Sequence, residues 1–90
     1  MSYFDSIRYE AEDGIYFEAT IGEVTQLIFI DISLLEDLSK KKAINNGGVA
    51  LTLFHSLESV IYRAVLKALD ENPSWNRNDP LPLLRSYLIK

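Results

Sequence analysis

The chain has 90 residues, of which 48% are hydrophobic, 11% aromatic and 24% charged, and its formal net charge is -4. This composition is typical of one small folded domain and excludes an intrinsically disordered chain. Because the sequence has no cysteine and one histidine, it excludes disulfides, and we expect neither a zinc site nor another cofactor.

The N-terminal part of the sequence predicts strands. Period-2 alternation predicts a strand over residues 15–20, in which Ile15, Phe17 and Ala19 share one face of a sheet. A turn that contains Gly22 precedes a second strand over residues 24–30, whose last four residues are all apolar. That apolar run indicates a buried, central strand. The alternating stretch at residues 6–11 favours an edge strand, joined through a turn at 12–14.

The middle of the sequence predicts two helices. Ser33 and Glu36 match a capping box, which predicts a short helix from Ser33 to the lysines at positions 40–42. After a polar Asn-Asn-Gly-Gly hinge, apolar residues at helical spacing predict one long helix over residues 48–71. We expect the core face of this helix to consist of Ala50, Leu53, Phe54, Leu57, Val60, Ile61, Ala64, Val65 and Ala68.

A second apolar strip, which we call the shoulder, flanks that core face. It consists of Leu51, His55, Tyr62, Leu66 and Leu69. The strip is too apolar for free solvent, so either the short helix and the C-terminal segment cover it or a second subunit does. We interpret the shoulder as a candidate interface and predict a homodimer or a complex with another protein.

The C-terminal part begins with a loop. Prolines at positions 73, 80 and 82 and several asparagines predict this loop after the long helix. Residues 83–90 then favour a last strand, with a short helix as the alternative. Together the elements predict one α+β domain over residues 1–90, in which a small antiparallel sheet packs against one long and one short helix in two layers.

The segments "GIYFEA", "FIDISLLEDL" and "INNGGVALTLFHSLESVIYRAVLKAL" together resemble the small bacterial family called domain of unknown function 1488. The likeness spans about residues 14–70 and lies in spacing and residue type. It implies a compact α+β fold with no assigned activity and no established catalytic residues.

The hinge is a candidate site for an anion or small ligand. Free N–H groups at the start of a helix attract anions, and lysines lie just before them in the sequence. The candidate residues are Lys42, Asn45, Asn46, Gly47 and Gly48. However, the sequence contains neither of the glycine-rich phosphate-binding motifs. The alternative, which we favour, is that Asn45 or Asn46 caps the helix with its side chain.

Two further candidates are pairs of neighbouring residues. His55 and Glu58 lie one helical turn apart, as a general base and its partner would, but no nucleophile or oxyanion donor accompanies them. We therefore predict that the protein is not an enzyme. Trp75 and Arg77 form a candidate loop contact, since an indole ring beside a guanidinium can anchor a peptide or stack on a base. The alternative places Trp75 over the end of the core.

The net negative charge disfavours a nucleic-acid partner, because binding to phosphates depends on clustered cations. No apolar stretch approaches the roughly 20 residues that cross a bilayer, and the first residues lack the pattern of a signal peptide. We therefore expect a cytoplasmic protein without a membrane partner. The predicted function is a non-catalytic protein-binding or regulatory module that acts through a helix face as a dimer. The alternative is a small-ligand or anion binder near residues 45–48.

Overall fold

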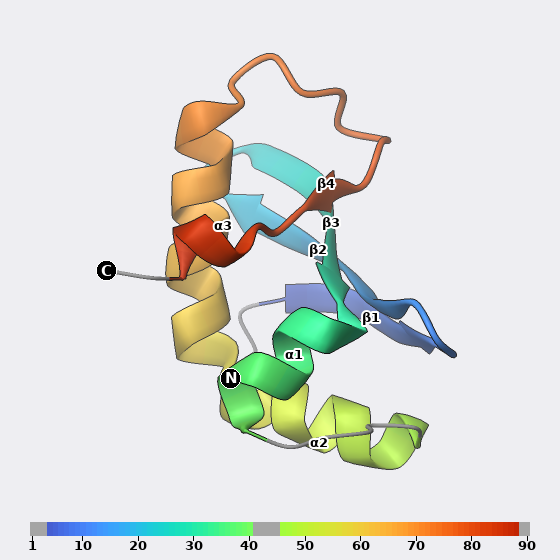
Figure 1. The fold of residues 1–90 in the computed structure, drawn as a ribbon. Coiled ribbons are helices and arrows are strands. Elements are labelled where there is room, and N and C mark those ends of the chain that lie inside the picture. Colours follow the sequence, from blue (N-terminus) through green and yellow to red (C-terminus); the bar gives the residue numbers. More distant parts are fainter. Residues whose placement is uncertain (1–3, 41–45, 89–90) are drawn as a thin grey trace.

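A computed structural model describes residues 4–40 and 46–88 (Figure 1). It contains four strands, β1 (Phe4–Glu10), β2 (Gly14–Ile21), β3 (Val24–Asp31) and β4 (Leu81–Pro82), in the sheet order β1-β2-β3-β4. The first three strands pair antiparallel, whereas β4 pairs parallel to β3. The α+β class is confirmed, but the sheet is mixed and not purely antiparallel as predicted.

The two central strands follow the predicted alternation. Ile15, Phe17 and Ala19 of β2 are at most 1% exposed, and Ile28 and Ile30 of β3 are fully buried. These side chains face the helices because alternate residues of a strand point to the same side of the sheet. The predicted strands at 15–20 and 24–30 are confirmed, and β3 lies inside the sheet between β2 and β4.

β1 is the predicted edge strand. Its register with β2 shifts between Asp5 and Arg8, where Ser6 has a φ of 53°. In the turn to β2, Gly14 has a φ of 153°, and a Cβ atom on it would lie 2.1 Å from the carbonyl oxygen of Ile30. The close approach of β3 therefore requires glycine at this position.

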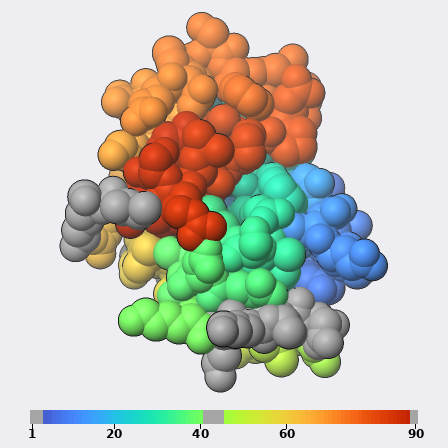
Figure 2. Space-filling view, viewed as in Figure 1, coloured from blue at the N-terminus to red at the C-terminus, as the bar shows by residue number. Residues whose placement is uncertain are grey.

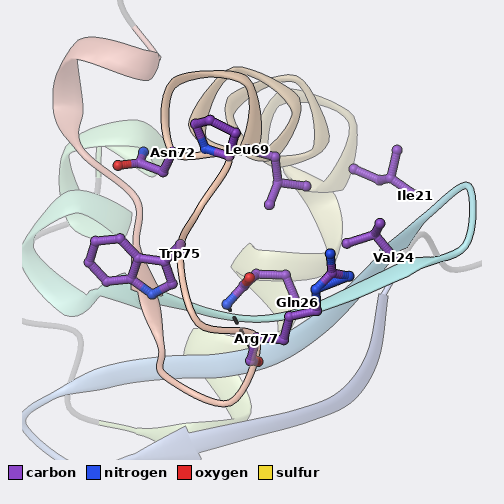
Figure 3. Close-up of a pocket in the computed structure, with 8 residues that line it drawn as sticks. Ile21, Val24, Gln26, Leu69, Asn72, Trp75 and Arg77 are labelled. Atoms are coloured by element: carbon purple, nitrogen blue, oxygen red, sulfur yellow. Dashed lines mark hydrogen bonds between the residues drawn. The ribbon is translucent and has the colours of Figure 1, made fainter.

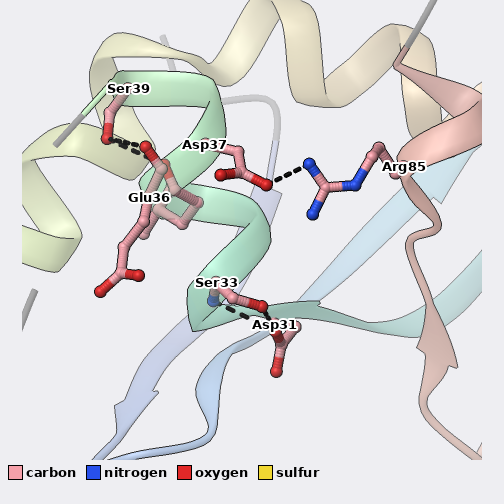
Figure 4. A network of polar contacts seen from close by, with 7 residues as sticks. Asp31, Ser33, Glu36, Asp37, Ser39 and Arg85 are labelled. Carbon is pink, nitrogen blue, oxygen red and sulfur yellow. Dashed lines mark hydrogen bonds and ion pairs between the residues drawn. The ribbon is translucent and has the colours of Figure 1, made fainter. Parts of the chain in front are cut away.

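The short helix α1 (Ile32–Ser39) has its N-cap two residues earlier than predicted (Figure 4). Its N-cap is Asp31, whose carboxylate accepts a hydrogen bond from the Ser33 backbone N–H at 3.1 Å. The predicted capping box at Ser33 is therefore wrong. Lys40, with a φ of 59°, ends the helix, and the lysines at positions 41 and 42 lie outside the described residues.

The predicted single long helix is wrong. The chain forms two helices, α2 (Gly47–Ser56) and α3 (Glu58–Glu71), which meet at 76° around Leu57. A straight helix over residues 48–71 would be about 36 Å long, whereas the largest extent of the fold is 34 Å. The bend keeps Phe54 of α2 and Ile61 of α3 both fully buried.

The residues of the predicted core face are buried or half-buried in both helices. Its members Ala50, Phe54, Ile61, Ala64, Val65 and Ala68 are fully buried, and Leu53, Leu57 and Val60 are half-buried. The ring of Phe54 packs on Phe4 of β1 and Phe17 of β2, with centroid distances of 5.7 and 4.9 Å. The core therefore lies between one face of the sheet and the α2–α3 pair.

In its described residues, 83–88, the C-terminal segment forms a short helix, which was the alternative, and not the predicted strand. β4 ends at Pro82, the Leu83 N–H donates to the Phe29 carbonyl oxygen at 2.8 Å, and a 3-10 helix, η1 (Arg85–Tyr87), follows. This segment crosses the front of the molecule in Figure 2, between the loop after α3 and α1. An ion pair between Arg85 and Asp37 joins η1 to α1 (Figure 4).

Within the described ranges, no single helix has both the length and the apolar composition needed to cross a membrane. α2 and α3 meet that test only when they are taken together, across their 76° bend.

Candidate functional site

A pocket of about 220 Å³ lies between the β2–β3 turn, the end of α3 and the loop over residues 72–80 (Figure 3). The β2–β3 hairpin, α3 and the loop all contribute lining residues, which are Ile21, Val24, Gln26, Leu69, Asn72, Pro73, Trp75 and Arg77. Ile21 and Val24 face each other across the hairpin and supply much of the apolar wall. The site can therefore accept an apolar group.

Gln26 fixes the loop side of the pocket. Its side chain lies on the inward face of β3 and is 2% exposed. Its Nε2 donates to the carbonyl oxygens of Asn76 and Asp79 from the loop at 3.1 and 3.0 Å, and to that of Leu27 at 3.0 Å. Carbonyl oxygens only accept, so the NH₂ group of the amide must face them. The Leu27 N–H adds a bond to the Arg77 carbonyl oxygen at 3.3 Å.

Trp75 and Arg77, the candidate loop contact, both line this pocket. The indole Nε1 of Trp75 donates to the Asp79 carbonyl oxygen at 3.0 Å, while 38% of the residue stays exposed. The side chain of Arg77 is exposed and forms no ion pair with any residue that the structure describes.

The shoulder is divided by the bend at Leu57. Leu51 and His55 lie on α2, and the other three members lie on α3. Tyr62 and Leu69 are half-buried, and Leu66 is 40% exposed. The five residues therefore do not line one straight helix as predicted. Only Leu69 belongs to the pocket.

His55 and Glu58 are in contact across the bend. The Nδ1 atom of His55 lies 2.5 Å from Oε2 of Glu58, the first residue of α3. Glu58 is 9% exposed, whereas the side chain of His55 is half-exposed. The pair links the two helices. No group of three potential metal ligands occurs among residues 4–40 and 46–88.

The hinge geometry matches the capping interpretation. Asn46 is the N-cap of α2, and its Oδ1 accepts from the N–H groups of Gly48 at 2.8 Å and Val49 at 3.3 Å. These are two of the donors that an anion would need. Lys42 and Asn45, the other two polar residues of the candidate anion site, lie outside the described residues.

Sequence reasoning missed the hairpin side of the pocket, Ile21, Val24 and Gln26, and also Asn72 and Pro73. One signal was present, because Gln26 occupies the same strand face as the buried Ile28 and Ile30. A polar side chain on a buried face needs a hydrogen-bond partner, and here the partners are loop carbonyl groups.

Comparisons with protein-family models, curated proteins and solved structures found no match for this chain. The resemblance to domain of unknown function 1488 therefore stays a prediction.

Proposed function

We propose that this protein is a non-catalytic protein-binding module that receives one apolar side chain of a partner in the pocket beside Trp75. The observation that carries this proposal is the pocket itself, with apolar walls from the hairpin and α3 and with Trp75 and Arg77 at its rim. Tryptophan and arginine are enriched among the residues that dominate binding energy at protein interfaces.

The size of the pocket favours a side chain over a whole cofactor. Pockets that hold drug-sized ligands have volumes of about 300–1,000 Å³, whereas this one has about 220 Å³. Such a volume suits a single leucine or phenylalanine side chain. The contact also involves a helix face, because Leu69 of α3 lines the pocket.

The pocket is formed before any partner arrives. Gln26 ties the loop to β3 through the carbonyl oxygens of Asn76 and Asp79, and Trp75 ties its own ring to Asp79. Binding therefore orders few additional groups, which reduces its entropic cost.

Fluorescence titration tests the proposal, since Trp75 is the only tryptophan of the chain. N-acetyl-phenylalaninamide and N-acetyl-leucinamide serve as probes, and N-acetyl-glycinamide serves as the control without a side chain. We expect the two apolar probes to change Trp75 emission saturably, with dissociation constants of about 1 mM from roughly 0.3 kcal/mol per heavy atom. The glycine compound should have no effect.

A matched pair of variants links the signal to the pocket. Val24→Phe fills the pocket and should abolish the response. Val49→Phe makes the same change at a position that is 47% exposed and outside the pocket, and it should leave the response intact. Absence of a saturable response in the unmodified protein, or full binding by Val24→Phe, would refute the proposal.

A further inference from the structure

The outward face of α3 carries a pattern of residues of which the pocket uses Leu69 alone. This α3 face consists of Tyr62, Arg63, Leu66, Leu69 and Asp70. Arg63 and Asp70 are exposed, Leu66 is 40% exposed, and Tyr62 and Leu69 are half-buried. The opposite side of the helix packs into the core. The α3 face is thus an apolar strip with a charged border.

The spacing of the apolar strip is that of helices packed side by side. Tyr62, Leu66 and Leu69 are separated by four and then three residues, the alternation found along the seam of paired helices. Arg63 and Asp70 each follow an outer member of the strip, so both lie on the same side of it. Neither of the two charged groups has an ion-pair partner in the described part of the chain.

We infer that α3 pairs antiparallel with the α3 of a second copy of this chain, about a twofold axis at Leu66. The axis is perpendicular to both helices and to the line that joins them. Such an axis reverses positions along the helix and keeps each side chain on its own side of the seam. Positions 62 and 70 are equally far from 66, and so are 63 and 69.

This symmetry brings complementary groups together. Leu66 meets Leu66 of the second copy, and Tyr62 meets Leu69 on the apolar side. On the charged side Arg63 meets Asp70, and the symmetry produces this ion pair twice. A parallel pairing would hold the two Arg63 side chains at one level and the two Asp70 side chains at another, with no opposite charge for either. Only the antiparallel arrangement pairs Arg63 with Asp70, and these two pairs favour it over the parallel one.

The inference goes beyond the proposed function, because its occupant is a second copy and its centre is Leu66, which does not line the pocket. α3 has 14 residues and spans about 21 Å. Two helices in contact over this length bury less surface than the roughly 1,200–2,000 Å² that stable interfaces bury. We therefore expect a weak dimer, whose affinity falls as the salt concentration rises.

Charge exchange tests the arrangement. Sedimentation equilibrium of the full chain at low salt, from about 10 µM to 1 mM, should show a monomer–dimer equilibrium. Arg63→Glu places like charges at both ion-pair positions, and so does Asp70→Arg. We expect each variant alone to raise the dissociation constant at least tenfold, the equivalent of about 1.4 kcal/mol. Circular dichroism verifies that both variants stay folded.

An equimolar mixture of the two variants provides the decisive measurement. In a mixed dimer, the introduced glutamate faces the introduced arginine, and the native Asp70 faces the native Arg63. The mixture should therefore dimerise as well as the unmodified protein. Val24→Phe fills the pocket from the hairpin side and changes no residue of the α3 face, so it should abolish probe binding and leave the dimer in place. The two proposals can therefore fail separately. A monomeric unmodified protein over the whole range, or a mixture that associates no better than its components, would overturn the inference.

Discussion

Replacing Gln26 by glutamate tests how the pocket is held together. The substitution preserves the size of the side chain but turns a donor into an acceptor when the carboxyl group is ionised. The introduced oxygen would face three carbonyl oxygens that now lie 3.0–3.1 Å from Nε2. Each lost bond costs about 1 kcal/mol, and a buried acceptor without a donor costs about 1–3 kcal/mol more. The NH₂ group has two hydrogens, so two such bonds are lost, and we expect a total loss of about 3–5 kcal/mol at pH 7.

Gln26→Met is the matched control, because it removes the donors without adding an acceptor. It should cost only about 1–2 kcal/mol, since Asn76 and Asp79 are exposed and water can reach their carbonyl oxygens. Urea unfolding followed by circular dichroism measures both losses. Trp75 emission should shift to the red in the glutamate variant, because its indole is bonded to the same loop.

The difference between the two variants should depend on pH. The surrounding carbonyl oxygens and the burial both favour the protonated carboxyl group, so the pKa of the introduced glutamate rises in the folded state above its ordinary value of about 4.3. The destabilisation is therefore absent below the unfolded-state pKa and grows as the pH rises through 4.3 towards the folded-state pKa. At pH 4 the glutamate variant should approach the methionine variant. Equal stabilities of the two variants at pH 7 would refute the argument that the carbonyl cluster selects a donor.

Three further predictions concern the fold, each measured by urea unfolding. Phe54→Ala should cost about 3–5 kcal/mol because the ring is fully buried, whereas Val49→Ala at an exposed position should cost less than about 0.5 kcal/mol. Asp31→Ala should cost about 0.5–2 kcal/mol by removing the cap of α1, and Asp31→Asn should retain most of that stability. Gly14→Ala should cost more than about 3 kcal/mol, because a Cβ atom would collide with the Ile30 carbonyl oxygen at a strained φ; a cost near zero would contradict the β2–β3 register.

The strands were predictable because their signal is local. The alternation of Ile15, Phe17 and Ala19 determines which face of β2 is buried, whatever the strand packs against. Gly22, with a φ of 65°, marks the turn between the two central strands. The start of α1 was harder to predict, because Asp31 and Ser33 are both good N-cap residues and lie only two positions apart.

The bend between α2 and α3 has no local signal. Residue 57 is a leucine, and neither proline nor glycine is near it in the sequence. On a helical wheel the buried residues before and after it fall on one continuous arc, so the pattern fits a single helix equally well. In the bent arrangement Phe54 contacts Phe4 and Phe17, which lie far away in sequence. Such tertiary contacts are absent from a periodicity argument.

The pocket was predictable only in part for the same reason. Trp75 and Arg77 were recognisable from their residue types, but their neighbours come from a hairpin about 50 positions earlier. The parallel pairing of β4 with β3 brings these segments together. Only two residues form that strand, too few for the alternation of residues to reveal it.

In the proposed function, the donor groups around the pocket favour recognition by shape over recognition by hydrogen bonds. Gln26 and Trp75 donate to loop carbonyl groups, and Asn72 Nδ2 donates to the Ala68 carbonyl oxygen at 2.8 Å and to the Tyr87 hydroxyl at 3.2 Å. These bonds hold the walls in place and leave the donors little capacity for a ligand. Arg77 is the one charged group among the eight lining residues, all of which the structure describes. An apolar side chain that fills the pocket therefore gains most of its affinity from buried area, and a neighbouring carboxylate of the same partner can add a contact with Arg77.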